Sequence, residues 1–154
     1  MCKKERTLSD FILKGYTQSY GLSFIMLSRE WERRVENSLL NYNLSLRELI
    51  ILKCLQRHNS IKQKDLSLVI GDPQRKISHC LSLLQEKALV GRECERGKGH
   101  AQCFYLTLSG RKTLCEATSM LSKHDEYFLG HLPRATREGI GQTLENVLVK
   151  KGLQ

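Results

Sequence analysis

The sequence has few of the residues and segments that mark several protein classes. Its 154 residues include only two prolines and 11 glycines, too few for a β-sandwich, whose many turns depend on these residues. No segment approaches the roughly 20 consecutive apolar residues that cross a bilayer. The charged first ten residues are followed by neither the apolar run nor the cleavage site of a signal peptide. We therefore expect a cytoplasmic protein without membrane contact.

Cysteine pairs of the C-x-x-C type are also missing, although the chain has six cysteines. Because thiols stay reduced in the cytoplasm, we expect free thiols, several of them buried. Cys54 and Cys115 fall on apolar faces of predicted helices and are expected in the core. For Cys80 we expect a half-buried, unreactive thiol.

Motifs that carry enzyme or metal chemistry are absent as well. The sequence has no Gly-rich phosphate loop, no His-Glu-x-x-His pair and no recognisable nucleophile elbow. The spacing of Cys94, His100 and Cys103 matches no standard zinc pattern and lacks a fourth ligand. We therefore expect a protein that is not an enzyme and that binds neither a metal nor a cofactor.

Positive charge is abundant and concentrated in the middle of the chain. The chain has 25 lysines and arginines against 16 acidic residues, a net charge of +9. Residues 60–112 hold ten basic and five acidic residues, whereas residues 113–154 are neutral overall. An excess of positive charge favours a polyanionic partner. The neutral C-terminal third is expected to have another task.

Apolar residues recur at steps of three and four along much of the chain, which is typical of amphipathic helices. The first stripe predicts a long helix over about residues 17–42, with Tyr20, Phe24, Leu27, Trp31, Val35 and Leu39 on its apolar side. Ser45 and Glu48 form a capping-box pattern, which predicts a second helix from Leu46 to about Arg57. Two further helices are expected at the end of the chain, the last of them after Pro133.

A short helix and a polar-faced helix are predicted in the basic segment. The short helix covers about residues 62–70 and ends at Gly71, after which Asp72 is expected as N-cap and Pro73 as first residue of the next helix. The buried stripe of this next helix is expected at Ile77, Leu81, Leu84 and Ala88. Its opposite face is then lined by Gln74, Arg75, Lys76, Ser78, His79 and Ser82.

Residues 89–94 and 101–106 read as two β-strands around a Gly-rich basic tip, which predicts a β-hairpin. The order helix, short helix, turn, polar-faced helix and basic hairpin is that of a winged helix-turn-helix. The sequence therefore predicts a mainly α fold with a small β-hairpin wing and long N- and C-terminal dimerisation helices. We expect a single domain over residues 1–154, with the winged helix-turn-helix at about 43–112 and the dimerisation helices at about 17–42 and 113–150.

The polar face of the predicted helix after Pro73 points to double-stranded DNA. An α-helix fits the major groove, where Arg can grip guanine and Gln can pair with adenine. The alternative is an ordinary solvated face, and the charge excess and the hairpin in the same segment favour DNA. The expected DNA-binding residues are Lys62, Lys64, Gln74, Arg75, Lys76, Ser78, His79, Ser82, Arg92, Arg96, Lys98 and His100.

Four runs of the sequence carry a family resemblance: IKQKDL at residues 61–66, GDPQRKIS at 71–78, LLQEKALVGR at 83–92 and LTLSG at 106–110. Over about residues 17–150 the chain resembles the MarR family of bacterial regulators. The strongest signal is Leu-x-x-Leu-x-x-Lys-Ala-Leu-Val, followed by a hairpin and Leu-Thr-x-x-Gly. One departure concerns the wing, because family wings carry an Asp-x-Arg pattern and this tip reads ERGKGH at residues 95–100.

The resemblance implies an obligate homodimer that binds a palindromic operator with half-sites about one helical turn (~34 Å) apart. The expected dimerisation residues are Tyr20, Phe24, Leu27, Trp31, Leu144, Val147 and Leu148. The resemblance to the MarR family also implies a sequence-specific transcriptional regulator, which we expect to be a repressor. Whether a small-molecule effector controls it stays open. Two alternatives stay open: a redox-responsive regulator that uses a thiol, and a winged helix that binds a protein partner instead of DNA.

Overall fold

The computed structural model describes residues 19–94 and 102–150 of the chain. Within these ranges the chain is mainly helical with one small sheet, as the sequence predicts. The elements, in chain order, are α2 (Tyr20–Leu39), the 3-10 helix η1 (Leu40–Tyr42), α3 (Leu46–His58), β1 (Ile61–Lys62), α4 (Gln63–Ile70), α5 (Gln74–Glu86), β2 (Val90–Cys94), β3 (Gln102–Leu106), α6 (Leu108–Leu129) and α7 (Arg134–Lys150).

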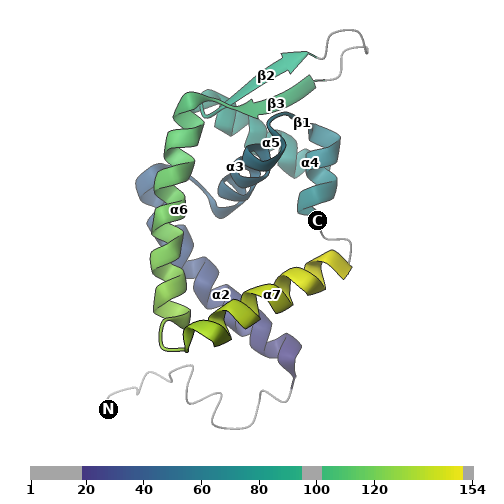
Figure 1. Cartoon of the computed structure of the whole chain (residues 1–154). Helices are drawn as coiled ribbons and strands as arrows, with labels where there is room; N and C mark the ends of the chain where they lie inside the picture. The colour runs from purple at the N-terminus through teal and green to yellow at the C-terminus, as the bar shows by residue number, and fades with distance from the viewer. Residues whose placement is uncertain (1–18, 95–101, 151–154) are drawn as a thin grey trace, which may run out of the picture.

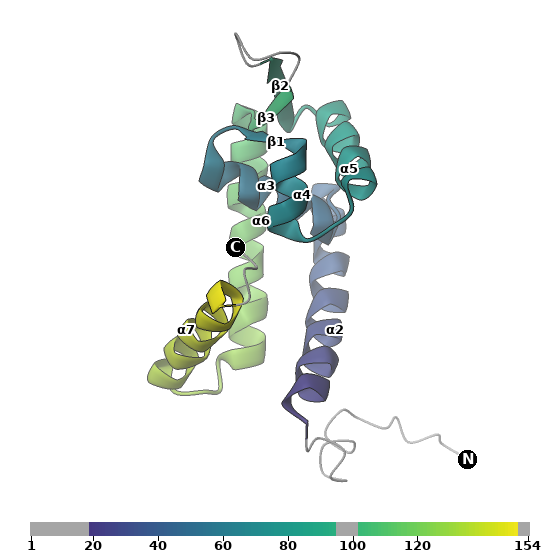
Figure 2. The same ribbon diagram turned by 90° about the vertical axis from the view of Figure 1, so that its right-hand side faces the viewer.

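Two parts of the molecule are distinguished in Figures 1 and 2, and we call them the head and the stalk. The head consists of α3, α4, α5 and the three strands, and the stalk of α2, α6 and α7. Helix α6 starts beside the sheet and runs down the length of the stalk, where α7 folds back at an angle (Figure 1). None of the helices that the structure describes is long and apolar enough to span a membrane.

One hydrophobic core joins the head to the upper part of the stalk. Its fully buried side chains come from five helices and include Val35, Leu39, Leu49, Ile51, Leu52, Leu55, Leu66, Ile77, Leu81, Leu84, Leu114 and Ala117. Burying a side chain of leucine size contributes roughly 1.5–3 kcal/mol. The core therefore fixes α2 and α6 against the head.

Helix α3 begins with the predicted capping box. The Ser45 hydroxyl accepts a hydrogen bond from the Glu48 amide, and the Glu48 carboxylate accepts one from the Ser45 amide at 2.7 Å. Glu48 is only 2% exposed, and its second carboxylate oxygen lies 2.6 Å from Lys87 Nζ. The buried negative charge is thus paired with a cation from the end of α5.

The sheet contains a strand that the sequence did not reveal. Strands β2 and β3 form the predicted antiparallel hairpin, and β1 pairs with the other edge of β3, giving the order β1-β3-β2. In this register Ile61 lies opposite Phe104, and both side chains are buried. A strand of two residues has no periodicity of its own, and only its pairing with β3 defines it.

Two expectations about α5 are wrong in detail. The helix begins at Gln74, with Pro73 as N-cap residue, and the Asp72 carboxylate binds Arg47 Nε at 2.6 Å instead of capping the helix. Ala88 does not belong to the buried stripe: α5 ends at Glu86, and Ala88 is exposed in a left-handed conformation with φ of 55°. Cys80 completes the buried stripe of α5 in its place.

The Leu-Thr-x-x-Gly run has a packing role where β3 meets α6. Thr107 caps α6, because its hydroxyl accepts a hydrogen bond from the Gly110 amide at 2.9 Å and donates to the Ala88 carbonyl at 2.8 Å. Gly110 is buried against the Leu89 carbonyl, and a Cβ at this position would overlap that oxygen. Only glycine lets α6 start this close to the backbone that leads into β2.

Replacement of Gly110 by alanine should therefore destabilise the head. We expect Gly110→Ala to lower the free energy of unfolding by about 1–3 kcal/mol, since the methyl group must push the backbone apart. Gly139→Ala is the matched control, because a Cβ at Gly139 in α7 meets no atom within 4 Å and alanine favours helix. Chemical denaturation measures both. Equal losses in the two variants would contradict a special role for the Leu89 contact.

Candidate nucleic-acid interface

Helix α5 has one buried and one exposed side. Ile77, Cys80, Leu81 and Leu84 face the core. The opposite side carries the six polar residues expected from the sequence, and all of them are exposed: Gln74, Arg75, Lys76, Ser78, His79 and Ser82. A helix of this kind can enter a groove with its polar face while its apolar face stays in the protein.

The turn before α5 is held by side-chain contacts. Gly71 adopts the left-handed conformation, with φ of 76°, that ends α4. Two hydrogen bonds then fix the next residues: Ser67 Oγ donates to the Asp72 carbonyl at 2.6 Å, and Gln63 Nε2 donates to the Gln74 carbonyl at 3.3 Å. The ion pair between Arg47 and Asp72 connects the same turn to the start of α3. The hydrogen bond to the Asp72 carboxylate raises the pKa of Arg47.

The other expected DNA contacts have different surroundings. Lys64 is exposed in the first turn of α4, whereas Lys62 is partly buried in β1, where it lies opposite Cys103. Arg92 is exposed on β2, and its guanidinium donates to Gln102 Oε1 at 3.2 Å. Three expected wing residues lie outside the described residues: Arg96, Lys98 and His100.

Four cysteines are free thiols with unequal exposure: Cys54, Cys80, Cys103 and Cys115. Cys80 is buried and Cys54 partly buried, and burial raises the pKa of both thiols. Since reactivity needs an exposed thiol with a lowered pKa, neither residue has the properties of a redox sensor. The expectation that Cys115 lies in the core is wrong: Cys115 is exposed on α6, because the apolar stripe of this helix passes through Leu114 and Ala117.

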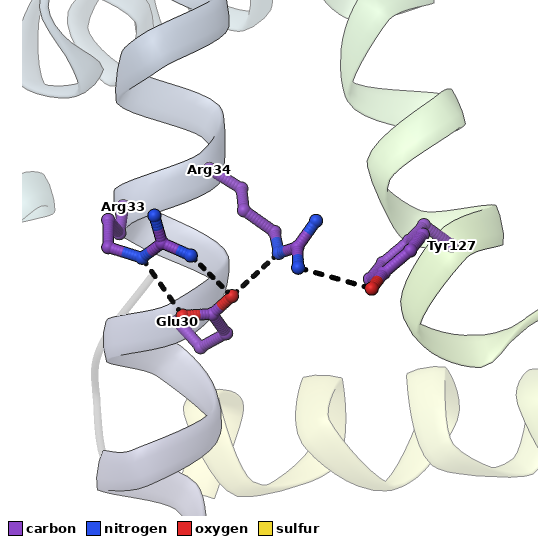
Figure 3. A network of polar contacts seen from close by, with 4 residues as sticks. All are labelled: Glu30, Arg33, Arg34 and Tyr127. Carbon is purple, nitrogen blue, oxygen red and sulfur yellow. Dashed lines mark hydrogen bonds and ion pairs between the residues drawn. The ribbon is translucent and has the colours of Figure 1, made fainter. Parts of the chain in front are cut away.

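A network of polar side chains joins the two long helices of the stalk, and Figure 3 shows it. On α2, Glu30 binds Arg33 at 2.8 Å and Arg34 at 2.6 Å, and the hydrogen bonds from these arginines lower the pKa of Glu30 to about 2. Arg34 also donates to the Tyr127 hydroxyl on α6 at 3.1 Å, and its guanidinium lies 4.3 Å from the centre of the Tyr127 ring. The contacts of Arg34 with Tyr127 thus link α2 to α6.

The stalk also has a broad exposed apolar surface. On α2 the exposed fraction is 88% for Tyr20, 55% for Phe24 and 43% for Leu27. On α7 no residue is buried, and its exposed apolar side chains include Leu144, Val147 and Leu148. Trp31 differs from the other expected dimerisation residues, because it packs against the core of its own chain and its indole N–H donates to Asp125 Oδ1 at 3.2 Å.

A pocket of about 490 Å³ lies where α2, α3 and α6 meet. Its lining is largely apolar, with two cations from α3, and consists of Trp31, Leu46, Leu49, Ile50, Lys53, Cys54, Gln56, Arg57 and Leu121. The volume is within the range of small-molecule sites. A mainly apolar lining with a basic edge is suited to an apolar ligand that carries an anionic group.

Sequence reasoning missed the residues that hold α5 in place. Neither Arg47 nor Gln63 is among the residues expected from the sequence to have a functional role. Their partners are distant in the sequence, since Arg47 binds Asp72 and Gln63 binds the backbone of Gln74. The local signal at Asp72, an acidic residue before Pro73, indicates an N-cap and not a partner of Arg47.

No model of a protein family matches the sequence, and no curated protein is significantly similar to it. Solved structures, in contrast, are similar in fold. MepR from S. aureus in complex with DNA superposes with a TM-score of 0.72 at 21% identity, over 86% of this chain and 98% of that chain. A transcriptional regulator of the MarR family from Rhodococcus sp. RHA1 superposes with a TM-score of 0.76 at 17% identity, over 92% of this chain and 96% of that chain.

CouR from Rhodococcus jostii RHA1, solved with bound p-coumaroyl-CoA, gives a TM-score of 0.75 at 16% identity, over 85% of this chain and 92% of that chain. These similarities extend over the head and the stalk together, because each covers more than four fifths of the chain. The chain therefore has the winged helix-turn-helix fold of MarR-family transcriptional regulators.

Proposed function

We propose that the chain is a transcription regulator of the MarR type that reads double-stranded DNA through α5. The observation that carries this proposal is the exposed polar face of α5, where Gln74, Arg75 and Lys76 occupy the first turn of a helix whose other face is buried. Residues near the start of such a helix are those that reach base edges. The DNA complex of MepR, which has the same fold, supports this reading.

The distribution of charge supports DNA over a protein partner. Residues 60–112 carry a net charge of +5, and Lys64, Arg75, Lys76 and Arg92 are exposed on α4, α5 and β2. Cations placed in this way displace counterions from phosphates, which supplies affinity without sequence information. The winged helix-turn-helix at about residues 43–112 would then be the DNA-binding part of a single domain.

A homodimer on a palindromic operator is the second part of the proposal. Helix α7 has 17 residues and none of them is buried, although most of the stability of a helix in a protein comes from the packing of its apolar face. A second copy that covers Leu144, Val147 and Leu148, together with Phe24 and Leu27 on α2, would supply the missing contacts. Repression follows when such a dimer occupies an operator that overlaps a promoter.

Regulation by a small molecule is the third part. The pocket at the junction of α2, α3 and α6 combines apolar walls with Lys53 and Arg57. CouR, which has the same fold, was solved with p-coumaroyl-CoA. We propose that this pocket takes an aromatic or aliphatic ligand that carries a carboxylate or another anionic group.

Loss of the Arg75 side chain should reduce sequence selectivity. If Arg75 contacts a base edge, Arg75→Ala costs about 1–3 kcal/mol on the preferred duplex and relaxes the preference at one position of each half-site. The preferred duplex is enriched from a random-sequence library with the wild-type protein. Titrations of this duplex and a scrambled duplex at two salt concentrations measure the effect.

Lys64→Ala is the control for this experiment, because a phosphate contact from α4 contributes charge only. It should weaken both duplexes alike and lower the slope of log affinity against log salt by about one unit. An Arg75→Ala variant with unchanged selectivity would show that α5 does not read bases through Arg75. Weak binding that hardly depends on salt would favour a protein partner.

A negative charge on the apolar side of α7 should separate the proposed dimer. Val147 is 52% exposed in the single chain, and Val147→Glu would place an unpaired carboxylate in the interface, which is costly. Gln142→Glu adds the same charge at an exposed position of α7 outside the apolar set and should leave the dimer intact. Sedimentation at micromolar concentration measures both, and a monomeric wild-type protein would contradict the proposal.

Ligand binding in the pocket should be visible in the fluorescence of Trp31, since this is the only tryptophan of the chain and it lines the pocket. We expect an aromatic carboxylate to change this fluorescence. Arg57→Ala should raise the dissociation constant about tenfold or more, because a hydrogen bond between two charged groups is lost. Arg29→Ala, which removes an exposed cation of α2 outside the pocket lining, should bind like the wild type. Equal affinities of the Arg57 and Arg29 variants would contradict the role of the basic edge.

A further inference from the structure

Two neighbouring residues in the first turn of α3 bind the two ends of α5. Arg47 Nε lies 2.6 Å from Asp72 Oδ2, two residues before α5 begins. Glu48 Oε1 lies 2.6 Å from Lys87 Nζ, and Lys87 directly follows the last residue of α5. We call Arg47–Asp72 and Glu48–Lys87 the end pairs of α5.

Each end pair is reinforced by a second contact of the same residue. The Asp72 carbonyl accepts a hydrogen bond from Ser67 Oγ at 2.6 Å, and Lys87 Nζ also donates to the Asn43 carbonyl at 2.7 Å. Burial is the main cause of the raised pKa of Cys80, and the charges that act on this thiol are those of the end pairs. Cys80 lies in the buried stripe of α5, the side of the helix that packs on the head.

The end pairs supply directional contacts to α5, which the hydrophobic core does not. Ile77, Leu81 and Leu84 are close-packed in the core and hold the helix of 13 residues against the head, but the burial of apolar area is itself non-directional. Hydrogen bonds between charged groups are short and directional. Contacts of this kind at both ends add directional restraints on the angle of α5.

The charges of the end pairs are complementary. At the start of α3 a cation, Arg47, is followed by an anion, Glu48, and each meets the opposite charge at its own end of α5.

We propose that the end pairs are positioning residues that set the angle of α5 and thereby the sequence selectivity of the protein on DNA. This inference rests on the proposed function of α5. Contacts to base edges depend on donor–acceptor distances and angles within narrow limits, whereas flexible cations find phosphates over a wider range. Loss of an end pair therefore reduces selectivity more than general affinity for DNA.

The pair Arg47–Asp72 is the better target for substitution, because Glu48 is buried and also caps α3. Arg47→Gln should lower the ratio of affinities for the enriched and the scrambled duplex about tenfold, the size of the loss of one base contact. The control is Lys123→Gln, which removes one positive charge from an exposed position in the stalk part of α6. It should leave the ratio unchanged.

Asp72→Asn separates positioning from a direct DNA contact of Arg47. Removal of a negative charge should tighten binding to both duplexes if only the overall charge matters. If the pair positions α5, Asp72→Asn instead lowers the affinity ratio as Arg47→Gln does. The double variant Arg47→Asp with Asp72→Arg, which restores the pair with reversed signs, should recover most of the ratio.

A measurement without DNA completes the test. The Lys76 and Ile77 amides, which donate to the Pro73 carbonyl at 2.9 and 3.2 Å, should exchange hydrogen faster in Arg47→Gln and in Asp72→Asn than in Lys123→Gln. Selectivity and exchange that survive both substitutions would overturn the inference and leave the proposed function intact. A wild-type protein that enriches no duplex would overturn both.

Discussion

The buried carboxylate of Glu48 is the interaction on which the arrangement of the head depends. It accepts hydrogen bonds from the Ser45 amide and hydroxyl and from Lys87 Nζ. A charge that is 2% exposed is tolerated only where partners replace its water. The start of α3 and the end of α5 must therefore meet at this point.

A second constraint acts on the stalk. Its two long helices are joined within the chain by polar contacts: Trp31 to Asp125, Arg34 to Tyr127 and Ser38 to His124. On α7, in contrast, no residue is buried, and the apolar side chains of Leu144, Val147 and Leu148 are exposed. The stalk thus combines a buried apolar contact between α2 and α6, made by residues such as Val35, Leu39, Leu114 and Ala117, with an exposed apolar surface on α7, which is expected of a surface that a second protein covers.

Features of the fold that depend only on residues close together in the sequence were predictable from local sequence patterns. The capping box at Ser45, the left-handed Gly71 and the exposed face of α5 were all predicted from the sequence and are present. Contacts between distant residues were not predictable. Asp72 carries the signal of an N-cap, yet Arg47, 25 residues earlier, binds its carboxylate. Strand β1 was not predicted because two residues are too few to show the alternation of apolar and polar side chains that marks a strand. Ala88 was wrongly assigned to the buried stripe of α5 because the helix ends before it, at Glu86.

The junction of α2, α3 and α6 connects these constraints. Helix α6 is continuous from Leu108, beside the sheet, to Leu129 in the stalk, so it connects the head directly to the stalk. In the proposed dimer the separation of the two α5 helices must match about one turn of DNA, ~34 Å. The contact of Arg34 with Tyr127 links α2 to α6, and the end pairs link α5 to α3 within the head. In the proposed regulator, a ligand at the junction would act on the separation of the heads, whereas the end pairs would act on the sequence that each head reads.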